Sequence, residues 1–486
     1  MKTQLIAIKR MLGLTLSLFI LASFSLFAQE KMKITTSSDE AKMLYDQGIE
    51  NHEMFKYPKA LKYFNKAVEI DPKFAMAHLY LSLLQSGDPE LEKKHLQKAV
   101  ELKNQVSEGE KNMILYVKAS EEGDEMAMKQ HIKSLELKYP EDERVISMTG
   151  WHHYTTENYS DALSCFKDAV DINNLYHPAY NMLGYTYWKL GNIEEAESSF
   201  LTYIELVPDI ANSHDSYASF LKNQGKFGKA TEEYKMALNY EPKYPASLKG
   251  LGDIYLFKGS YGLAREYYKK YAESTDNNNN KFYGLLLEAS VELHNNNAEE
   301  ALAIMDEYIQ MAENKQLPFQ KINAIAYKGY ILTETGKPEE GLEYYMKASD
   351  IIESAEMSEK LRERMRTNAQ LWRFYALTSN DNMVKAGQEQ EKCKQMLSEK
   401  GSAYQWKRFN SISGLLEIKK GNYEKARNYL AEGTNNPTNW YYTGLAWDLS
   451  GNTTKAHEYY QKVINYYENS IELGTSRNKA MAWIKE

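Results

Sequence analysis

Residues 177–210 read HPAYNMLGYTYWKLGNIEEAESSFLTYIELVPDI and contain the pattern that decides the fold. Residues at i, i+3, i+4 and i+7 form one face of an α-helix, and here they are Tyr180, Leu183, Gly184 and Tyr187. Gly191 follows, and glycine readily takes the left-handed conformation that ends a helix. A second amphipathic stretch runs to Pro208, which cannot continue a helix. The segment therefore predicts two helices joined by a tight turn.

The same pattern recurs at multiples of 34 residues. Prolines that would end a second helix stand at Pro72, Pro140, Pro208 and Pro242. Small residues where the two helices of a unit would cross stand at Ala60, Ala162, Ala196, Ala230 and Ala264. A period of about 34 residues is typical of a solenoid built from helix–turn–helix repeats.

This unit resembles the tetratricopeptide repeat, whose pattern places an aromatic residue, Leu-Gly, Tyr, Ala, Phe, Ala and Pro at fixed offsets. The resemblance implies an all-α fold, a right-handed α-solenoid of about twelve helix–turn–helix repeats. An N-terminal array over 41–278 would contain repeats at 41–74, 75–108, 109–142, 143–176, 177–210, 211–244 and 245–278, of which the second and third match poorly. The asparagine run at 277–280 is a candidate seam between two halves of the solenoid.

Beyond residue 278 the period loosens. The equivalent small residues are Ala301, Gly341, Ala386, Ala426 and Ala456. We interpret residues 279–470 as longer helical hairpins of the same kind and residues 471–486 as a C-terminal cap, because the end of a solenoid needs a polar cover.

Residues 1–28 have the features of a bacterial-type signal peptide. A basic start is followed by the apolar run 11–27 and by the small residue Ala28. Cleavage before Gln29 would leave a linker at 29–40 and an exported protein, periplasmic or associated with the cell envelope. The alternative is an N-terminal membrane anchor that is retained.

Charge and cysteine content exclude two classes of protein. The formal net charge of −8 becomes −11 when Lys2, Lys9 and Arg10 leave with the signal peptide. An acidic chain without basic runs is a poor binder of nucleic acid. Two cysteines, Cys165 and Cys393, are too few for a disulfide framework.

Motifs for catalysis, cofactors or metals are absent from the sequence, so we expect no enzyme, no cofactor and no metal. His152 and His153 are adjacent, and neighbouring side chains on a helix point about 100° apart. The spacing supplies no third ligand, and a metal site there is disfavoured.

The resemblance implies that the first helix of each repeat lines a concave groove. Its groove positions in this sequence predict a partner-binding surface made of Trp151, Tyr154, Asn181, Tyr185, Trp188, Asp215, Lys222, Lys249 and Asp253. Tyrosine and tryptophan are frequent anchors of binding surfaces. The competing interpretation is that these rings only fill contacts between neighbouring repeats.

We therefore expect an exported, non-catalytic scaffold that binds a protein or peptide segment in the groove, with peripheral association with the cell envelope. The alternative is a glycan- or oligosaccharide-binding protein of the cell envelope, because exposed aromatic rings also stack on sugars.

The targeting prediction can be checked directly. N-terminal sequencing of the protein isolated from its cells should begin at or near Gln29, since a signal peptidase cleaves after a small residue such as Ala28. An intact Met1 recovered in the membrane fraction would instead support the retained anchor.

Overall fold

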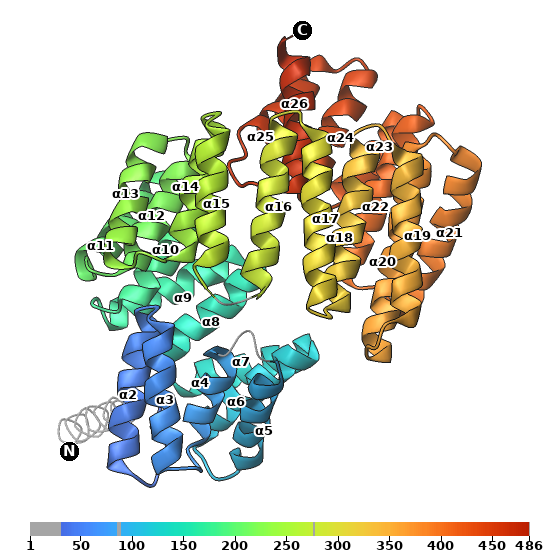
Figure 1. Cartoon of the computed structure of the whole chain (residues 1–486). Helices are drawn as coiled ribbons and strands as arrows, with labels where there is room; N and C mark the ends of the chain where they lie inside the picture. Colours follow the sequence, from blue (N-terminus) through green and yellow to red (C-terminus); the bar gives the residue numbers. More distant parts are fainter. Residues whose placement is uncertain (1–30, 85–88, 276–277, 486) are drawn as a thin grey trace, which may run out of the picture. The chain divides into compact units, whose positions relative to one another are not determined.

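The computed structural model of the chain describes residues 31–84, 89–275 and 278–485. These residues form 25 helices and no strand, which confirms the all-α fold (Figure 1). The predicted signal peptide and its cleavage site lie outside the described residues. Among the helices that are described, none combines the length and the apolar character needed to cross a membrane.

The described helices α2 to α25 pair into twelve antiparallel hairpins, and one further helix follows. The prediction of about twelve repeats is therefore confirmed. The chain divides into two compact units, one up to Tyr217 and one from Ala218. The first unit contains α2 (Asp39–Glu53), α3 (Tyr57–Ile70), α4 (Ala75–Leu84), α5 (Pro89–Leu102), α6 (Glu108–Glu122), α7 (Glu125–Lys138), α8 (Glu143–Thr155), α9 (Tyr159–Ile172), α10 (His177–Lys189) and α11 (Ile193–Leu206). The boundary between the units falls within α12 (Ala211–Asn223).

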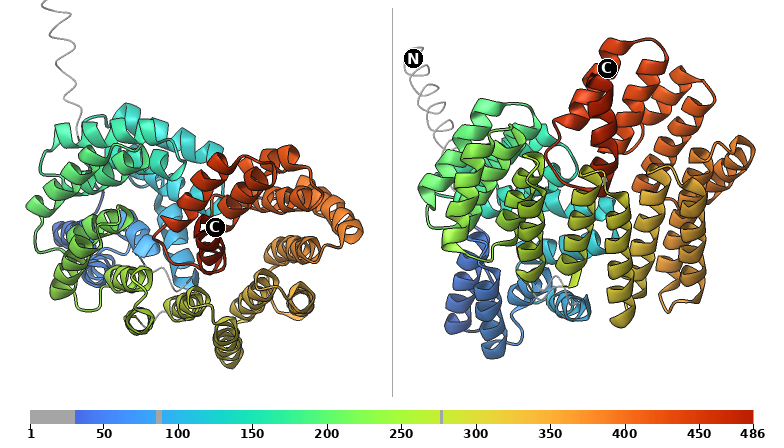
Figure 2. Two further views of the ribbon diagram at one scale, coloured as in Figure 1. Left: turned by 90° about the horizontal axis from the view of Figure 1, so that it is seen from above. Right: turned by 45° about the horizontal axis from the view of Figure 1, so that its top comes forward.

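The second unit ends with a helix that returns to an earlier part of the same unit. Its helices are α13 (Phe227–Tyr240), α14 (Pro245–Phe257), α15 (Tyr261–Glu273), α16 (Asn278–His294), α17 (Ala298–Asn314), α18 (Pro318–Glu334), α19 (Pro338–Ser354), α20 (Glu359–Ser379), α21 (Met383–Lys400), α22 (Ala403–Lys419), α23 (Tyr423–Ala431), α24 (Pro437–Leu449), α25 (Thr453–Ile464) and α26 (Ile471–Lys485). The final helix, α26, packs against α16 as well as against α24 and α25 (Figure 2). Residues 471–485 are thus an integrated helix of this unit.

In six of the hairpins, an aromatic ring of the second helix packs against a glycine of the first helix. A Cβ added to Gly184 of α10 would lie 2.6 Å from the ring of Phe200 of α11, which is fully buried. The same contact, always 16 residues apart, joins Gly48 to Phe64, Gly150 to Phe166, Gly252 to Tyr268, Gly329 to Tyr345 and Gly444 to Tyr460. The missing side chain lets the two helices approach closely and lets the ring fill the space between them.

The turn between the two helices of a hairpin contains a residue in the left-handed backbone conformation, with positive φ. Gly191 closes the turn between α10 and α11 with φ 82°, and Gly336 does the same between α18 and α19 with φ 90°. The turn between α20 and α21 uses Asp381, with φ 54°, in place of a glycine. Asp tolerates this conformation better than most residues with a side chain.

The segment before α2 is held by hydrogen bonds to acidic side chains of the first unit. The Thr35 amide donates to Glu110 Oε1 at 2.8 Å, and the Thr36 hydroxyl donates to Asp71 Oδ2 at 2.6 Å. The predicted linker therefore forms specific contacts over its described part. The predicted seam near residue 278 adjoins residues that are not described and stays a prediction.

The packing of the hairpins predicts that Ala196→Leu destabilises the fold. Ala196 lies on α11 with no exposed surface, so three added carbon atoms would force α10 and α11 apart. We expect a loss of about 1–3 kcal/mol in the free energy of unfolding, measured by urea denaturation. Glu194→Gln, at an exposed position of the same helix, should stay within about 0.5 kcal/mol. Equal denaturation midpoints for both variants would contradict the assigned helix crossing.

Candidate functional site

In the first unit, the predicted groove residues separate into exposed rings and buried polar groups. Trp151 is half exposed and stacks on Tyr154, with ring centroids 6.0 Å apart and planes 17° apart. Tyr185 and Trp188 are half-buried neighbours with centroids 6.3 Å apart. Tyr185 also contacts the buried ring of Phe200 edge-on at 5.1 Å, and this contact is part of the hairpin core.

The two polar members of this set are buried. Asn181 is 5% exposed, and its amide donates a hydrogen bond to Asn212 Oδ1 at 3.3 Å. Asp215 is 7% exposed. Both side chains therefore present little surface to an incoming partner, in contrast to the ring of Trp151.

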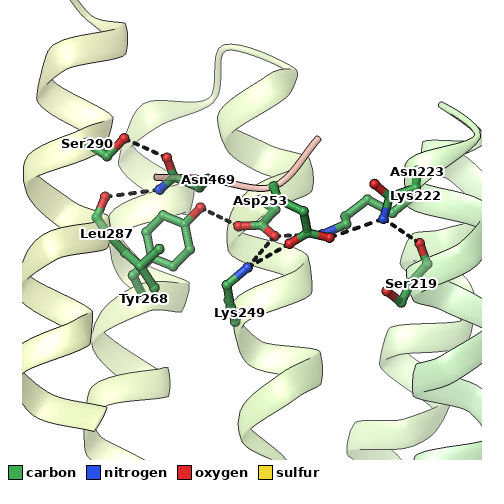
Figure 3. Close-up of polar contacts among 10 residues, drawn as sticks. Ser219, Lys222, Asn223, Lys249, Asp253, Tyr268, Leu287, Ser290 and Asn469 are labelled. Atoms are coloured by element: carbon green, nitrogen blue, oxygen red, sulfur yellow. Dashed lines mark hydrogen bonds and ion pairs between the residues drawn. The ribbon is translucent and has the colours of Figure 1, made fainter. Parts of the chain in front are cut away.

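In the second unit, the structure brings Lys222, Lys249 and Asp253 together in one ionic cluster (Figure 3). The Lys222 and Lys249 ammonium groups lie 2.7 Å and 2.9 Å from Asp253 Oδ2. Glu468, from the segment between α25 and α26, supplies the second carboxylate, at 2.7 Å from Lys222 and 3.0 Å from Lys249. The Tyr268 hydroxyl donates to the other oxygen of Asp253 at 2.8 Å.

Neighbours of Glu468 extend these contacts along the predicted groove. The Tyr467 ring packs edge-on between Phe227 and Phe257, with centroid distances of 5.0 Å and 5.3 Å. The Asn469 amide donates to the Leu287 carbonyl at 3.2 Å. Lys222, Lys249 and Asp253 thus bind a segment of the chain itself, which the sequence pattern did not reveal.

Charge neutralisation fixes the protonation states of this cluster. Burial alone would raise the pKa of the Glu468 carboxyl, but the ammonium groups of Lys222 and Lys249 outweigh it and hold that pKa well below its usual range. Burial alone would lower the pKa of Lys222, but Asp253 and Glu468 raise it above its usual value. The contribution of Glu468 to stability is lost as the pH falls through its lowered pKa, and that of Lys222 as the pH rises through its raised pKa. The cluster therefore stabilises the unit throughout the neutral range.

Glu468→Gln should destabilise the second unit, because it leaves the buried Lys222 and the partly buried Lys249 facing the single carboxylate of Asp253. We expect a loss of about 2–3 kcal/mol at pH 7, less than for a fully enclosed pair because 35% of the Glu468 side chain is exposed. Urea denaturation at neutral pH measures the loss.

The matched control is Glu458→Gln, which removes the same charge from an exposed pair with Lys455. Its cost should be below about 0.5 kcal/mol. If the two variants unfold at the same urea concentration, the cluster does not stabilise the unit.

A separate pocket in the second unit is lined mainly by α18, α20, α22 and α24, the first helices of the last four hairpins. Tyr345 of α19 and Glu472 of α26 complete its wall. Its volume is about 230 Å³, larger than a cavity of about 150 Å³ that accommodates a benzene molecule. Aromatic side chains supply much of the wall, namely Tyr327, Tyr330, Tyr345, Trp372, Tyr375, Tyr404 and Tyr442. Polar side chains between them are Asn323, Asn368, Arg408, Asn436, Asn439 and Glu472.

Two polar groups of this pocket lack a partner within the described part of the chain. Arg408, a half-buried residue of the pocket wall, forms no hydrogen bond or ion pair there. Asn439 is 5% exposed, and its Oδ1 accepts no hydrogen bond. Buried polar groups are nearly always hydrogen-bonded, so the unpaired Oδ1 of Asn439 marks the pocket as a candidate site for a polar ligand, and Arg408 adds a positive charge there.

The tyrosines at the base of the pocket are oriented by a buried carboxylate. Glu334 accepts hydrogen bonds from the hydroxyls of Tyr375 and Tyr442, the latter at 2.6 Å, and from the Lys479 ammonium group at 2.6 Å. Burial alone would raise the pKa of Glu334, but Lys479 outweighs it and lowers that pKa. A carboxylate that stays charged fixes both hydroxyls and therefore the shape of this wall.

Sequence reasoning did not find this pocket, although a signal was present. Residues that line the pocket recur at fixed sequence distances before the four turn residues with positive φ, which are Gly336, Asp381, Gly421 and Gly451. Thirteen residues before these turns stand Asn323, Asn368, Arg408 and Thr438, and nine residues before them stand Tyr327, Trp372, Ile412 and Tyr442.

Comparison with known protein families finds the tetratricopeptide repeat in four places. The matches cover residues 41–74, 177–210, 221–279 and 439–470. Tetratricopeptide repeat protein 6 of Homo sapiens is 27% identical over 115 residues, which are 23% of this chain and 22% of that protein. Superkiller complex protein 3 of Mus musculus is 26% identical over 114 residues, 24% of this chain and 7% of that protein. The chain thus spans less than a quarter of the length of either relative.

Two of the solved structures that match this chain cover about a third of it. The crystal structure of MamA is 20% identical, with a TM-score of 0.29, and covers 35% of this chain and 95% of its own. A thermophilic TPR protein of Thermus thermophilus is also 20% identical, with a TM-score of 0.31, and covers 37% of this chain and 98% of its own. Over the four matched stretches the chain is similar to the tetratricopeptide repeat, a module that is typical of protein-interaction scaffolds and generally non-catalytic.

Proposed function

We propose that this protein is an exported, non-catalytic scaffold that binds an extended protein or peptide segment in the pocket of the second unit. The observation that carries the proposal is Arg408, which lines an aromatic pocket and has no partner within the described residues. Concave, largely aromatic pockets with a few converging polar groups are the usual form of a binding site.

The chemistry of the pocket favours a segment that contains an acidic side chain. A guanidinium binds a carboxylate through two parallel hydrogen bonds, and the pair gains strength where water is partly excluded. The amide side chains of Asn323 and Asn439 can pair with the amide and carbonyl groups of an extended backbone. The rings of Tyr327 and Tyr404 offer apolar area with few rotamers to lose.

The second candidate is the binding of a glycan. The observation in its favour is Tyr404, which is 64% exposed at the pocket, where a sugar ring could stack on it. Amide side chains also hydrogen-bond sugar hydroxyls. An unpaired cation, in contrast, favours a carboxylate-bearing ligand, so we rank the acidic protein segment first.

The test is affinity selection of peptides from a random display library on the immobilised protein, with an array of neutral oligosaccharides probed in parallel. We expect the selected peptides to contain Asp or Glu. Their affinity should fall at least tenfold in the Arg408→Gln variant, which corresponds to about 1.4 kcal/mol or more.

Lys407→Gln is the matched control, because it removes the same charge from an exposed neighbour on α22. It should leave the affinity unchanged. Selected peptides without acidic residues, or equal affinity in the Arg408→Gln variant, would contradict the proposal. Binding of oligosaccharides alone would replace it with the glycan function.

A further inference from the structure

Three side chains that commonly bind metals converge in the first unit. Glu136 lies on α7, His153 on α8 and Cys165 on α9, and their ligand atoms all lie within 4.8 Å of one another. His153 Nε2 is 3.9 Å from Glu136 Oε1. The sequence provided no third ligand near the histidine pair, because these residues lie on three successive helices and meet only through the fold.

We propose that Glu136, His153 and Cys165 form a binding site for a divalent transition-metal ion of the zinc type. A thiolate, an imidazole and a carboxylate are the ligand types that Zn²⁺ takes in proteins, at about 2.0–2.3 Å from the ion. An ion bound at those distances would draw the three atoms together by about 1 Å. All three side chains are only partly buried, so rotation about their own bonds can achieve this.

The charges around Cys165 favour a cation at this place. Asp161 and Asp168 lie on α9 with Cys165, and together with Glu136 they place negative charge around its sulfur. A divalent ion at this place would balance part of that charge. Cys165 would bind it as a thiolate and release its proton to solvent.

Three protein ligands leave one tetrahedral position open. In zinc proteins such a position holds water or a ligand from a partner, whereas closed structural sites have four protein ligands. The site would thus accept an additional donor, and it belongs to the first unit, whereas the pocket that contains Arg408 belongs to the second.

Cys393 serves as the internal comparison. It is buried on α21, where Glu389 stands one helical turn before it. Among the described residues, Cys393 belongs to no group of three potential ligands. The two cysteines therefore differ in that only Cys165 has a histidine and a glutamate close to its sulfur.

The experiment is a titration of the mature full-length protein, stripped of metal by a chelator, with Co²⁺. A thiolate-to-cobalt charge-transfer band should appear at one equivalent and should disappear when Zn²⁺ is added. Cys165→Ser should abolish the band, and His153→Ala and Glu136→Gln should each weaken Co²⁺ binding at least tenfold. Cys393→Ser should bind Co²⁺ like the unmodified protein, and circular dichroism checks that each variant is folded.

The proposal is wrong if the folded, unmodified protein gives no thiolate-to-cobalt band. It is also wrong if the band survives in Cys165→Ser and is lost in Cys393→Ser. Unchanged Co²⁺ affinity in both His153→Ala and Glu136→Gln would show that a lone thiol binds the ion. None of these outcomes depends on peptide binding at Arg408.

Discussion

The contact between an aromatic ring and a bare helix backbone is the constraint on which the hairpins of this protein depend. Phe200 occupies the space in which a side chain of Gly184 would stand, and the same arrangement joins Gly444 to Tyr460 near the other end of the chain. Because the two partners are always 16 residues apart, the hairpins with this contact keep the same helix crossing even where the spacing between hairpins changes. The hairpin that begins with the 21-residue α20 lacks the contact and shares one continuous core with its neighbours from α18 to α22.

The constant contact within hairpins and the changing spacing between them explain how much of the fold could be predicted from the sequence. The 34-residue period predicted seven repeats up to residue 278, where α2 to α15 form seven hairpins. Ala301 and Ala456, predicted as packing positions of the later repeats, are fully buried. The pocket was not predicted. The repeats beyond residue 278 vary in length, and the predicted groove positions covered only regular repeats before it, so Asn368 and Trp372 were not among them.

The predicted groove shows the limit of reasoning from a repeat. The pattern placed Lys222, Lys249 and Asp253 on first helices of consecutive repeats, and in the structure the three form one ionic cluster, while their role in binding a partner stays a prediction. It could not reveal that Glu468 pairs with them, since 246 residues separate it from Lys222 and no periodicity relates the two. An excess of positive charge on a predicted groove can therefore bind an acidic segment of the same chain as well as an acidic partner. The metal ligands illustrate the same limit, because Glu136 reaches His153 only through tertiary packing.

The return of α26 to α16 also restricts how this protein can evolve. An open solenoid gains or loses repeats at little cost, because each repeat contacts only its neighbours. In the second unit, duplication of one hairpin between α16 and α25 would move α26 away from α16 and carry Glu468 away from its two lysines. The number of repeats in this unit is therefore fixed by its closure, and variation among descendants should accumulate in helix lengths and side chains instead of in repeat copy number.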